Sequence, residues 1–384
     1  MTSADGRGTW AWDSVETIRK AGSPVATAFT GGGSLAVSWL FNHAGASRAF
    51  LEAQIPYDER ALEDYIGHAG PHPAVQETAR RLAMVARQRA RRFGGGDRAI
   101  GLGVSAALAT DRQRRGQDRA FLAACNNTNY SFTHLQFDKT ADRTAQEEVL
   151  SSVLLVNLAR SCNCSIGEYA APEWAVVEQA TARVDSNVEQ LLDGDVAAVE
   201  IKEAASMPSV ATQLLVPGSF NPFHAGHAGL AAAAQRSSGR VAGFELSIHN
   251  VDKPTLPYDK IMQRVDQPRD GRCLVLTGEP TFLGKARVLP GCWFAIGFDT
   301  AVRLLAPGYY DGTMAGVQRA LQELRVLGSR FYVAGRQWQG KFQGLENVEV
   351  PEAFKDMFVE IPEADFRLDM SSTDLRQKTQ SDAG

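Results

Sequence analysis

Cysteine is scarce in this sequence, and the cysteines present do not form a metal-binding pattern. The 384 residues include five Cys. A zinc site of the Cys-x-x-Cys type needs two intervening residues and a second pair, whereas Cys162 and Cys164 are separated by one residue. Five cysteines in so long a chain also fall short of a disulfide framework. The sequence therefore predicts no protein-bound metal, and reduced thiols in a cytoplasmic protein.

Long hydrophobic runs and an excess of one charge sign are also missing. No apolar run approaches about 18 residues, and residues 1–20 lack the basic-then-apolar order of a signal peptide. Forty Lys and Arg residues stand against 44 Asp and Glu, which gives a net charge of −4. This composition predicts no membrane partner, and it argues against a chain-wide cationic surface for nucleic acid.

One segment departs from this balance, because residues 80–93 hold six Arg and no acid. Its apolar residues recur at helical spacing, and it lacks the interleaved aromatics that stack on bases. We expect a helix whose basic face, with Arg80, Arg87 and Arg91, is solvated or contacts another subunit. We also expect the protein to be a homo-oligomer that binds no nucleic acid.

The pattern of apolar segments predicts an α/β fold with two domains. In the first series, strands are expected at 25–29, 98–104, 120–127 and 130–137, and helices at 13–20 (with Asp13 as N-cap), 34–41, 74–93 and 146–159. In the second series, strands are expected at 213–216, 243–248, 273–277, 293–296 and 330–333, and helices at 225–236, 300–305 and 314–327. The stretch between the two series lacks this alternation of strands and helices, although 173–180 is expected to be helical. We place the domains at 10–168 and 212–384, with a linker at 169–211.

The segment that carries chemistry is Gly218-Ser-Phe-Asn-Pro-Phe-His-Ala-Gly-His227, which follows an apolar strand and opens an Ala-rich helix. Gly218 and Ser219 can bring backbone N–H groups against a phosphate. His224 and His227 are three residues apart, so at the first helical turn both can face one ligand. Gly226 leaves room for that ligand, and the positive end of the helix points at the same anion.

A second segment, Ser371-Ser372-Thr373-Asp-Leu-Arg376, ends 149 residues after His227 (376 − 227). Hydroxyls before a helix act as N-caps, and the helix N–H groups bind oxyanions. Arg376 adds a guanidinium whose geometry suits phosphate. Taken alone, the segment is typical of a capped helix.

Together the two segments resemble the nucleotidylyltransferase superfamily, and within it nicotinamide or nicotinate mononucleotide adenylyltransferases. The resemblance covers about 214–377 and implies a Rossmann-like domain with a parallel sheet. It implies His224, His227 and Arg376 as catalytic residues and Mg²⁺ bound with ATP. Phosphate-binding residues would be Gly218, Ser219, Phe220, Gly226, Ser371, Ser372 and Thr373, and acceptor-binding residues Lys253, Gly297 and Asp299. The family's stacking Trp has no match, although Tyr309 and Tyr310 follow Pro307-Gly308.

The N-terminal series, with Thr30-Gly31-Gly32-Gly33, resembles the CinA C-terminal domain, the nicotinamide mononucleotide deamidase family. The departures are informative. The family's catalytic Ser falls on Ala28, and its Lys falls on Leu62. Without a nucleophile and its activating group, amide hydrolysis has no attacking species, so we predict an inactive domain.

These observations predict transfer of AMP from ATP to nicotinamide or nicotinate mononucleotide, with release of pyrophosphate. Two alternatives stay open at this point. One is a cytidylyltransferase-like enzyme with another phosphorylated acceptor, and the other is a non-catalytic pyridine-nucleotide sensor. The position of Asp299 in the sequence would also suit the N-cap of a helix that begins before Ala301.

Overall fold

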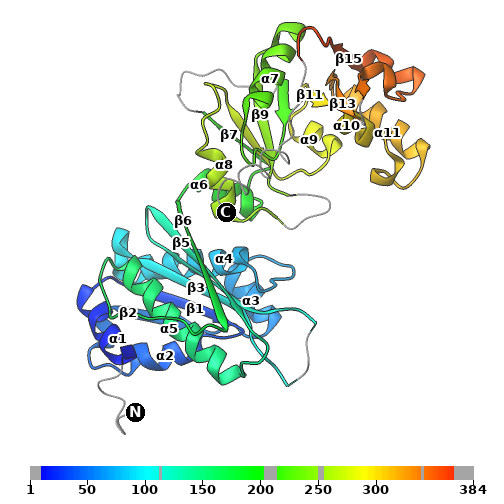
Figure 1. Cartoon of the computed structure of the whole chain (residues 1–384). Coiled ribbons are helices and arrows are strands. Elements are labelled where there is room, and N and C mark those ends of the chain that lie inside the picture. The colour runs from blue at the N-terminus through cyan, green and yellow to red at the C-terminus, as the bar shows by residue number, and fades with distance from the viewer. Residues whose placement is uncertain (1–9, 112–114, 203–213, 250–254, 339–340, 367–384) are drawn as a thin grey trace. The chain divides into compact units, whose positions relative to one another are not determined.

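The computed structural model describes residues 10–111, 115–202, 214–249, 255–338 and 341–366, which form two α/β units (Figure 1). Unit 1 comprises Met1–Val184 with Pro257–Asp259, and unit 2 comprises Asp185–Leu256 with Lys260–Gly384. Each unit has its own β-sheet and its own hydrophobic core. The predicted α/β fold class is confirmed.

Unit 1 is built on a six-stranded mixed sheet in the order β2-β1-β3-β4-β5-β6. The first three strands in this order are parallel, and each of the others is antiparallel to its neighbour. Their bounds are β1 Val25–Thr30, β2 Phe50–Gln54, β3 Ile100–Ala107, β4 Asp118–Cys125, β5 Asn129–Phe137 and β6 Ala175–Arg183. The unit's helices are α1 Trp10–Ala21, α2 Ser34–Phe41, α3 Glu59–Ile66, α4 Gln76–Ala90 and α5 Arg143–Ser161, with short turns at Ala46–Arg48, Arg91–Gly95 and Gly96–Arg98.

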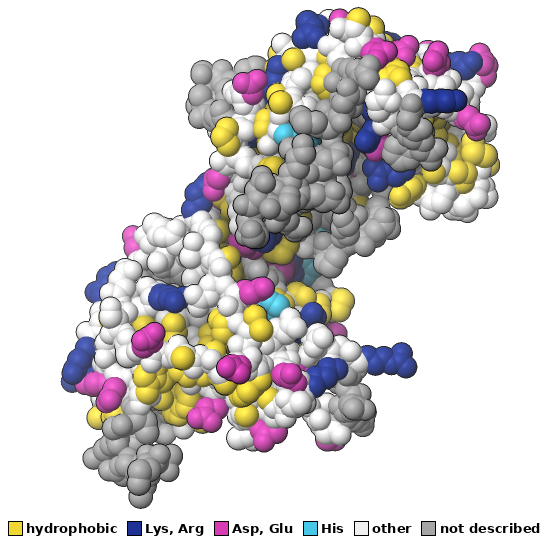
Figure 2. Space-filling model, viewed as in Figure 1, with side chains coloured by type: hydrophobic (Ala, Val, Ile, Leu, Met, Phe, Trp, Pro, Cys, Tyr) yellow, Lys and Arg dark blue, Asp and Glu magenta, His cyan; other side chains and the backbone are white. Residues whose placement is uncertain are grey.

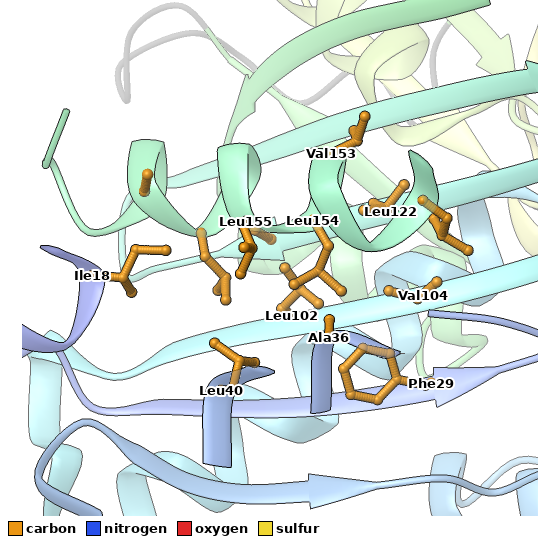
Figure 3. Packing of buried hydrophobic residues seen from close by; sticks show 14 of the residues in the cluster. Ile18, Phe29, Ala36, Leu40, Leu102, Val104, Leu122, Val153, Leu154 and Leu155 are labelled. Carbon is orange, nitrogen blue, oxygen red and sulfur yellow. The ribbon is translucent and has the colours of Figure 1, made fainter. Parts of the chain in front are cut away.

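The two faces of β1 are buried against different helices, because successive side chains of a strand point to opposite faces. Val25 and Phe29 join the main core with α1, α2 and α5 (Figure 3). Ala26 and Ala28 instead pack toward α4 and α3. A strand that is buried on both faces has a continuous apolar sequence, and this pattern is what predicted β1.

Two glycines of β3 allow α4 to lie directly on the sheet. A Cβ at Gly101 would lie 2.0 Å from the Ala83 carbonyl oxygen, and one at Gly103 would lie 2.2 Å from that of Ala79. Glycine is therefore required at both positions by close packing of a helix on a strand.

Several expected elements of unit 1 differ in the structure. The helix expected at 173–180 is wrong, because Ala175–Arg183 forms β6, which pairs along its whole length with β5. Its Val and Thr residues suit a strand, and pairing decides between the two states. Helix α1 begins at Trp10, whose indole N–H donates to the Gly167 carbonyl at 2.8 Å, so Asp13 lies inside the first turn and is not the N-cap.

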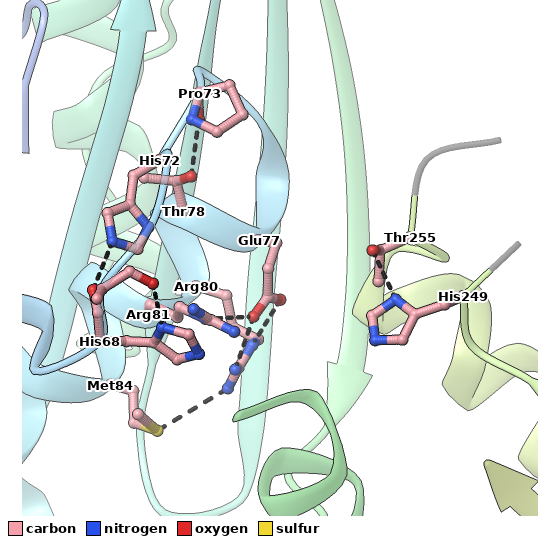
Figure 4. A network of polar contacts seen from close by, with 11 residues as sticks. His68, His72, Pro73, Glu77, Thr78, Arg80, Arg81, Met84, His249 and Thr255 are labelled. Carbon is pink, nitrogen blue, oxygen red and sulfur yellow. Dashed lines mark hydrogen bonds and ion pairs between the residues drawn. The ribbon is translucent and has the colours of Figure 1, made fainter. Parts of the chain in front are cut away.

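Three of the four arginines of α4 form ion pairs with two carboxylates of unit 1. Arg80, expected on a solvated face, is fully buried, and both Arg80 and Arg81 donate to the Glu77 carboxylate at 2.9 Å (Figure 4). Arg89 is bound by Glu52. The expectation of an exposed Arg80 is wrong because Glu77 lies one turn before the basic run. On the visible surface of both units, charges of the two signs are interspersed (Figure 2).

Unit 2 is built on a seven-stranded sheet in the order β15-β12-β11-β8-β9-β10-β7. Its strands are parallel except β7, which runs antiparallel to β10. Their bounds are β7 Ala198–Ile201, β8 Leu214–Pro217, β9 Ala242–Ser247, β10 Leu274–Thr277, β11 Trp293–Gly297, β12 Phe331–Ala334 and β15 Phe358–Ile361; β13 Arg336–Trp338 and β14 Lys341–Gln343 form a separate pair.

The helices accompanying this sheet are α6 Ser186–Asp193, α7 Ala225–Ser238, α8 Tyr258–Val265, α9 Phe282–Val288, α10 Phe298–Leu304 and α11 Met314–Val326, with 3-10 turns at Pro307–Tyr309, Leu345–Asn347 and Glu352–Met357. The segment 169–211, expected as a linker, contains β6 of unit 1 and α6 and β7 of unit 2. The chain passes from one unit to the other between Val184 and Asp185. Over the residues that the structure describes, no helix is both long and apolar enough to cross a membrane.

Candidate nucleotide-binding site

The sheet order of unit 2 identifies one edge as the place to look for a ligand. From β8 the chain proceeds through β9 and β10 on one side, and through β11, β12 and β15 on the other. The reversal occurs between β8 and β11, which pair in parallel through Leu214 with Trp293 and Leu215 with Phe294, at the amino-terminal halves of the two strands. In open α/β sheets, ligands bind in the crevice at such a switch point. The Gly218–His227 segment follows β8 directly.

The turn after β8 is held in shape by its own residues and by Gln267. The Gly218 N–H donates to the Glu245 carbonyl of the neighbouring strand at 3.0 Å. Gln267 accepts from the Phe223 N–H at 2.6 Å and donates to the Phe220 carbonyl at 3.0 Å. Phe220 is buried at a φ of 44°, and the Asn221–Pro222 peptide bond is cis. The turn is therefore fixed by tertiary contacts before any ligand binds.

The two histidines occupy defined positions at the start of α7. His224 is the N-cap, and its Nδ1 accepts from the Gly226 N–H at 3.2 Å. His227 is the third helical residue, and its Nδ1 accepts from the His224 N–H at 3.2 Å. A neutral imidazole whose Nδ1 accepts carries its proton on Nε2. Both rings therefore present an Nε2–H donor.

The surroundings keep both rings neutral. Their ring centroids lie 3.7 Å apart in a stacked arrangement. Burial and, as the smaller cause, the neighbouring His224 together lower the pKa of His227 to about 4. Burial also lowers the pKa of His224. At neutral pH the pair therefore acts as hydrogen-bond donors, and positive charge at this site comes from the helix N-terminus.

A cavity of about 480 Å³ opens beside this turn, and we call it the switch-point cavity. Its size is in the usual range for small-molecule sites. It is bounded by the carboxyl ends of β8 and β9, by the start of α9 and by α10. The residues lining it are Pro217, Gly218, Ser219, Asn221, Glu245, Leu246, Ser247, Ile248, His249, Leu256, Arg264, Pro280, Thr281, Phe282, Lys285, Thr300, Arg303, Leu304, Tyr309 and Tyr310.

A buried ion pair forms part of the cavity wall. Glu245 is fully buried, and Lys285 is 8% exposed. One carboxylate oxygen of Glu245 accepts from Lys285 Nζ at 2.7 Å, and the other accepts from the Thr277 hydroxyl at 2.6 Å. Both carboxylate oxygens of Glu245 therefore accept a hydrogen bond. The charges of Glu245 and Lys285 cancel only while both residues are present.

Aromatic residues also line the cavity, among them Tyr309 and Tyr310. Tyr309 is 44% exposed, and Tyr310 is half-buried with its hydroxyl donating to the Leu304 carbonyl at 2.8 Å. Burial raises the pKa of Tyr310 to about 12. Tyr309 is therefore the exposed ring available to a flat ligand.

Of the three residues predicted to bind the acceptor, the structure describes Gly297 and Asp299. Gly297 is the N-cap of α10, so Asp299 is not the N-cap, and that reading of it is wrong. Both Asp299 oxygens instead accept from Arg336 Nη1 at 3.3 Å. Neither residue lines the switch-point cavity, although their neighbour Thr300 does. Lys253 lies outside the described residues; His249, before it, bonds Thr255 at 2.9 Å (Figure 4).

The C-terminal segment from Ser371 through Arg376, including Ser372 and Thr373, lies outside the described residues. The last described residue, Phe366, packs on α7. A Cβ at Gly229 would lie 2.7 Å from the Phe366 ring, and Arg236 donates to the Asp365 carbonyl at 3.2 Å. The chain therefore leaves the described part of unit 2 beside the helix that begins with His224.

In unit 1 the glycine turn after β1 is occupied by a carboxylate of the chain itself. Glu147 of α5 accepts from the backbone N–H groups of Gly33 and Leu35, each at 2.9 Å, and from the Ser34 hydroxyl at 3.1 Å. These are the groups at the start of α2 that would otherwise face an anion. Ala28 and Leu62, which the resemblance in sequence aligns with the deamidase family's Ser and Lys, are both buried.

The sequence analysis did not identify the charged residues that line the switch-point cavity. Glu245 was hidden inside an apolar strand, where a single acid carries no distinctive spacing. Lys285 and Arg303 come from two short helices, and only the fold brings them together. Among the described residues, no group of three or more His, Cys, Asp or Glu side chains could hold a metal ion, and all five cysteines are free thiols.

Comparisons with known proteins found similarity only among solved structures. No family model matches the chain. No curated protein matches it either. The competence/damage-inducible protein CihA from Agrobacterium tumefaciens is 20% identical at a TM-score of 0.32, over 39% of this chain and 96% of that one. A CinA superfamily protein from Enterobacter cloacae is 14% identical at 0.32, over 40% and 90%. These neighbours are CinA-family proteins, and at these values the likeness decides nothing about activity.

Proposed function

We propose that the protein is a nucleotidylyltransferase that transfers AMP from ATP to nicotinamide or nicotinate mononucleotide. The observation that carries the proposal is the pair of neutral imidazoles at the start of α7. They belong to the turn at the topological switch point whose Gly218, Ser219 and Asn221 line the switch-point cavity, although neither imidazole lines it. Their Nδ1 atoms accept from backbone N–H groups, so each neutral ring carries its proton on Nε2. Donors fixed in advance are what stabilises charge that develops in a transition state.

In the proposed reaction, a phosphate oxygen of the acceptor attacks the α-phosphorus of ATP. The bond from that phosphorus to the oxygen bridging to the β-phosphate breaks, and pyrophosphate leaves with the electron pair. No covalent intermediate with the protein is needed, so catalysis consists of positioning and charge stabilisation. His224, His227 and the N-terminus of α7 would bind the triphosphate. Mg²⁺ arriving with ATP would neutralise part of its charge.

The acceptor is assigned to the switch-point cavity. Gly218 and Ser219 line it directly, so a ligand in the cavity would contact the phosphate-binding turn. The exposed ring of Tyr309 would stack on the flat base of a mononucleotide. Leu246, Ile248 and Phe282 supply the apolar surface that small-molecule sites need.

The proposed role of Ser371–Arg376 is to bind the triphosphate from the side opposite His224 and His227. Phe366 is held against Gly229, two residues after His227. Ser371 follows Phe366 by five residues (371 − 366), which can span at most about 17 Å. A triphosphate bound at the start of α7 would therefore be within reach of this segment.

Unit 1 is proposed to be inactive as a deamidase. Alanine and leucine cannot replace a hydroxyl nucleophile and its activating Lys. In addition, the Glu147 carboxylate holds the N–H groups with which the glycine turn could bind an anionic substrate. A role in assembly would be compatible with both observations.

The experiment that tests the proposed function is a turnover assay with ATP or CTP against a panel of phosphorylated acceptors. Formation of dinucleotide and pyrophosphate from ATP and a pyridine mononucleotide supports the proposal. Turnover only with CTP and a phosphorylated alcohol would replace it with a cytidylyltransferase. Binding of pyridine nucleotides with no turnover would replace it with a nucleotide sensor.

A further inference from the structure

Strand β6 lies at one edge of the unit 1 sheet, and it is longer than the other edge strands of the two described main sheets. It has nine residues, whereas the other edges are β2 with five, β7 with four and β15 with four. An edge strand presents a row of unpaired N–H and C=O groups, which can serve as a template for pairing with another chain. Among these edges, β6 is therefore the one best suited to accept a further strand.

The hydrogen bonds between β6 and β5 determine which backbone groups of β6 face outward. At the end of the strand, the Val184 N–H donates to the Thr128 carbonyl at 2.7 Å. Bonded and non-bonded positions alternate along an antiparallel pair, so the even-numbered residues of β6 bond to β5. The backbone N–H and C=O groups that point away from the sheet in the middle of the strand are those of Val177, Gln179 and Thr181.

These outward groups make no hydrogen bond within the part of the chain that the structure describes. On either side of them the outward positions are used. The Ala175 N–H donates to the Pro172 carbonyl at 2.9 Å, and the Arg183 carbonyl accepts from the hydroxyl of Tyr258, which belongs to unit 1, at 3.1 Å. Residues 177–181 are therefore an open stretch of strand, which we call the β6 edge.

The features that usually protect an edge strand from pairing are missing from β6. Proline, lysine and β-bulges are common protections. The strand Ala175–Arg183 contains neither proline nor lysine, and its pairing register with β5 is unbroken over all nine residues. The side chain of Val176 is 56% exposed, so apolar surface accompanies the open backbone. A long and unprotected edge of this kind is expected to be covered in the native assembly.

We propose that the β6 edges of two copies of this chain pair with each other, antiparallel, about a two-fold axis at Gln179. In this register Gln179 faces its own counterpart, and Val177 of each copy faces Thr181 of the other. All the outward groups of both β6 edges are then paired, by about six hydrogen bonds, two for each facing pair. The dimer goes beyond the proposed nucleotidyl transfer, and it gives unit 1 a role in assembly.

The side chains of β6 favour a second copy as the occupant, because they are complementary to themselves in this register. Glu178 lies opposite Ala180 of the second copy, and Arg183 lies opposite Ala175. Like charges directly opposite each other destabilise a strand pair, and here each charged side chain faces an alanine. The one acid and the one base of β6 also cancel, so two copies of the strand carry no net charge that would repel.

The test measures the oligomeric state of the full chain by sedimentation velocity, for wild type, Gln179→Pro and Gln179→Thr. Wild type should sediment as a dimer. Proline at 179 removes an outward N–H from both copies and no bond to β5, so it should weaken dimerisation at least about tenfold. Gln179→Thr keeps that N–H and is the matched control, which should remain dimeric. A wild type that is monomeric at about 100 µM, or a Gln179→Pro protein as dimeric as the control, overturns the proposal.

Hydrogen exchange of the wild type tests the same pairing without a substitution, in case circular dichroism shows that Gln179→Pro has not folded. The amides of Val177, Gln179 and Thr181 should exchange slowly in the dimer and rapidly after dilution to monomer. Rapid exchange of these amides in a dimeric protein shows that the copies meet at another surface, which overturns the proposal. Slow exchange in a monomer shows that the chain covers its own β6 edge, and this result overturns it as well.

Discussion

Replacing Lys285 by methionine should destabilise unit 2 strongly, because it leaves the Glu245 carboxylate buried without a counter-charge. Glu245 is 0% exposed, and its contact with Lys285 Nζ is 2.7 Å long. Methionine preserves most of the side-chain volume, so the loss is electrostatic and not a cavity effect. Removal of one partner of a buried ion pair costs about 3 to 5 kcal/mol of unfolding free energy.

The assay is equilibrium unfolding in urea followed by tryptophan fluorescence, with attention to separate transitions of the two units. The double variant Glu245→Gln with Lys285→Met should recover much of the loss, since it removes both charges. Arg287→Ala is the matched control on the same helix: its ion pair is exposed, so its effect should stay within about 0.5 kcal/mol. A Lys285→Met protein as stable as this control, or a double variant no better than the single one, would refute the reasoning.

The remaining predictions concern the other contacts described above. Glu147→Ala removes the acceptor at the start of α2 and should cost about 1 to 2 kcal/mol, whereas the exposed Glu148→Ala should be near neutral; equal effects would contradict that role. Because the pKa of His227 is lowered from 6.5 to about 4, its stabilising contribution is full above pH 6.5 and lost as pH falls toward 4; His227→Gln should flatten that dependence in urea titrations. Arg376→Ala should weaken ATP binding about tenfold to a hundredfold by calorimetry, and unchanged affinity would leave the proposed contact unsupported. Nicotinamide mononucleotide given alone should release no ammonia, and enzymatic release would show an active nucleophile in unit 1.

Much of the fold follows from local pattern, and each exception has its own physical cause. Strands such as β1 and helices such as α2 were predicted because buried runs and glycine turns are local signals. The segment that became β6 has no such signal, since its state is decided by pairing with β5. Arg80 looked exposed because its counter-charge, Glu77, lies just outside the basic run. The first case is decided by a distant strand, whereas in the second the partner lies one turn earlier on the same helix, outside the segment 80–93 that was considered.

The same distinction applies to the site. His224 and His227 were found because a strand, a turn and a helix start follow one another in sequence. Glu245, Lys285 and Arg303 come from three separate elements, so only the sheet order brings them to one cavity. The role of Glu147 in filling the glycine turn was equally hidden, since 114 residues separate it from Gly33.

The measurement that tests the central claim most directly is the rate of dinucleotide formation by wild type and by His227→Ala, with folding checked by circular dichroism. The claim is that a neutral His227 donates from Nε2 to the triphosphate. The account predicts that wild type forms dinucleotide from ATP and a pyridine mononucleotide. It also predicts that folded His227→Ala has a kcat lower by about a hundredfold to a thousandfold, as for loss of an oxyanion donor. A folded His227→Ala protein with near-normal turnover, or a wild-type protein that forms no dinucleotide with either mononucleotide, would contradict the account.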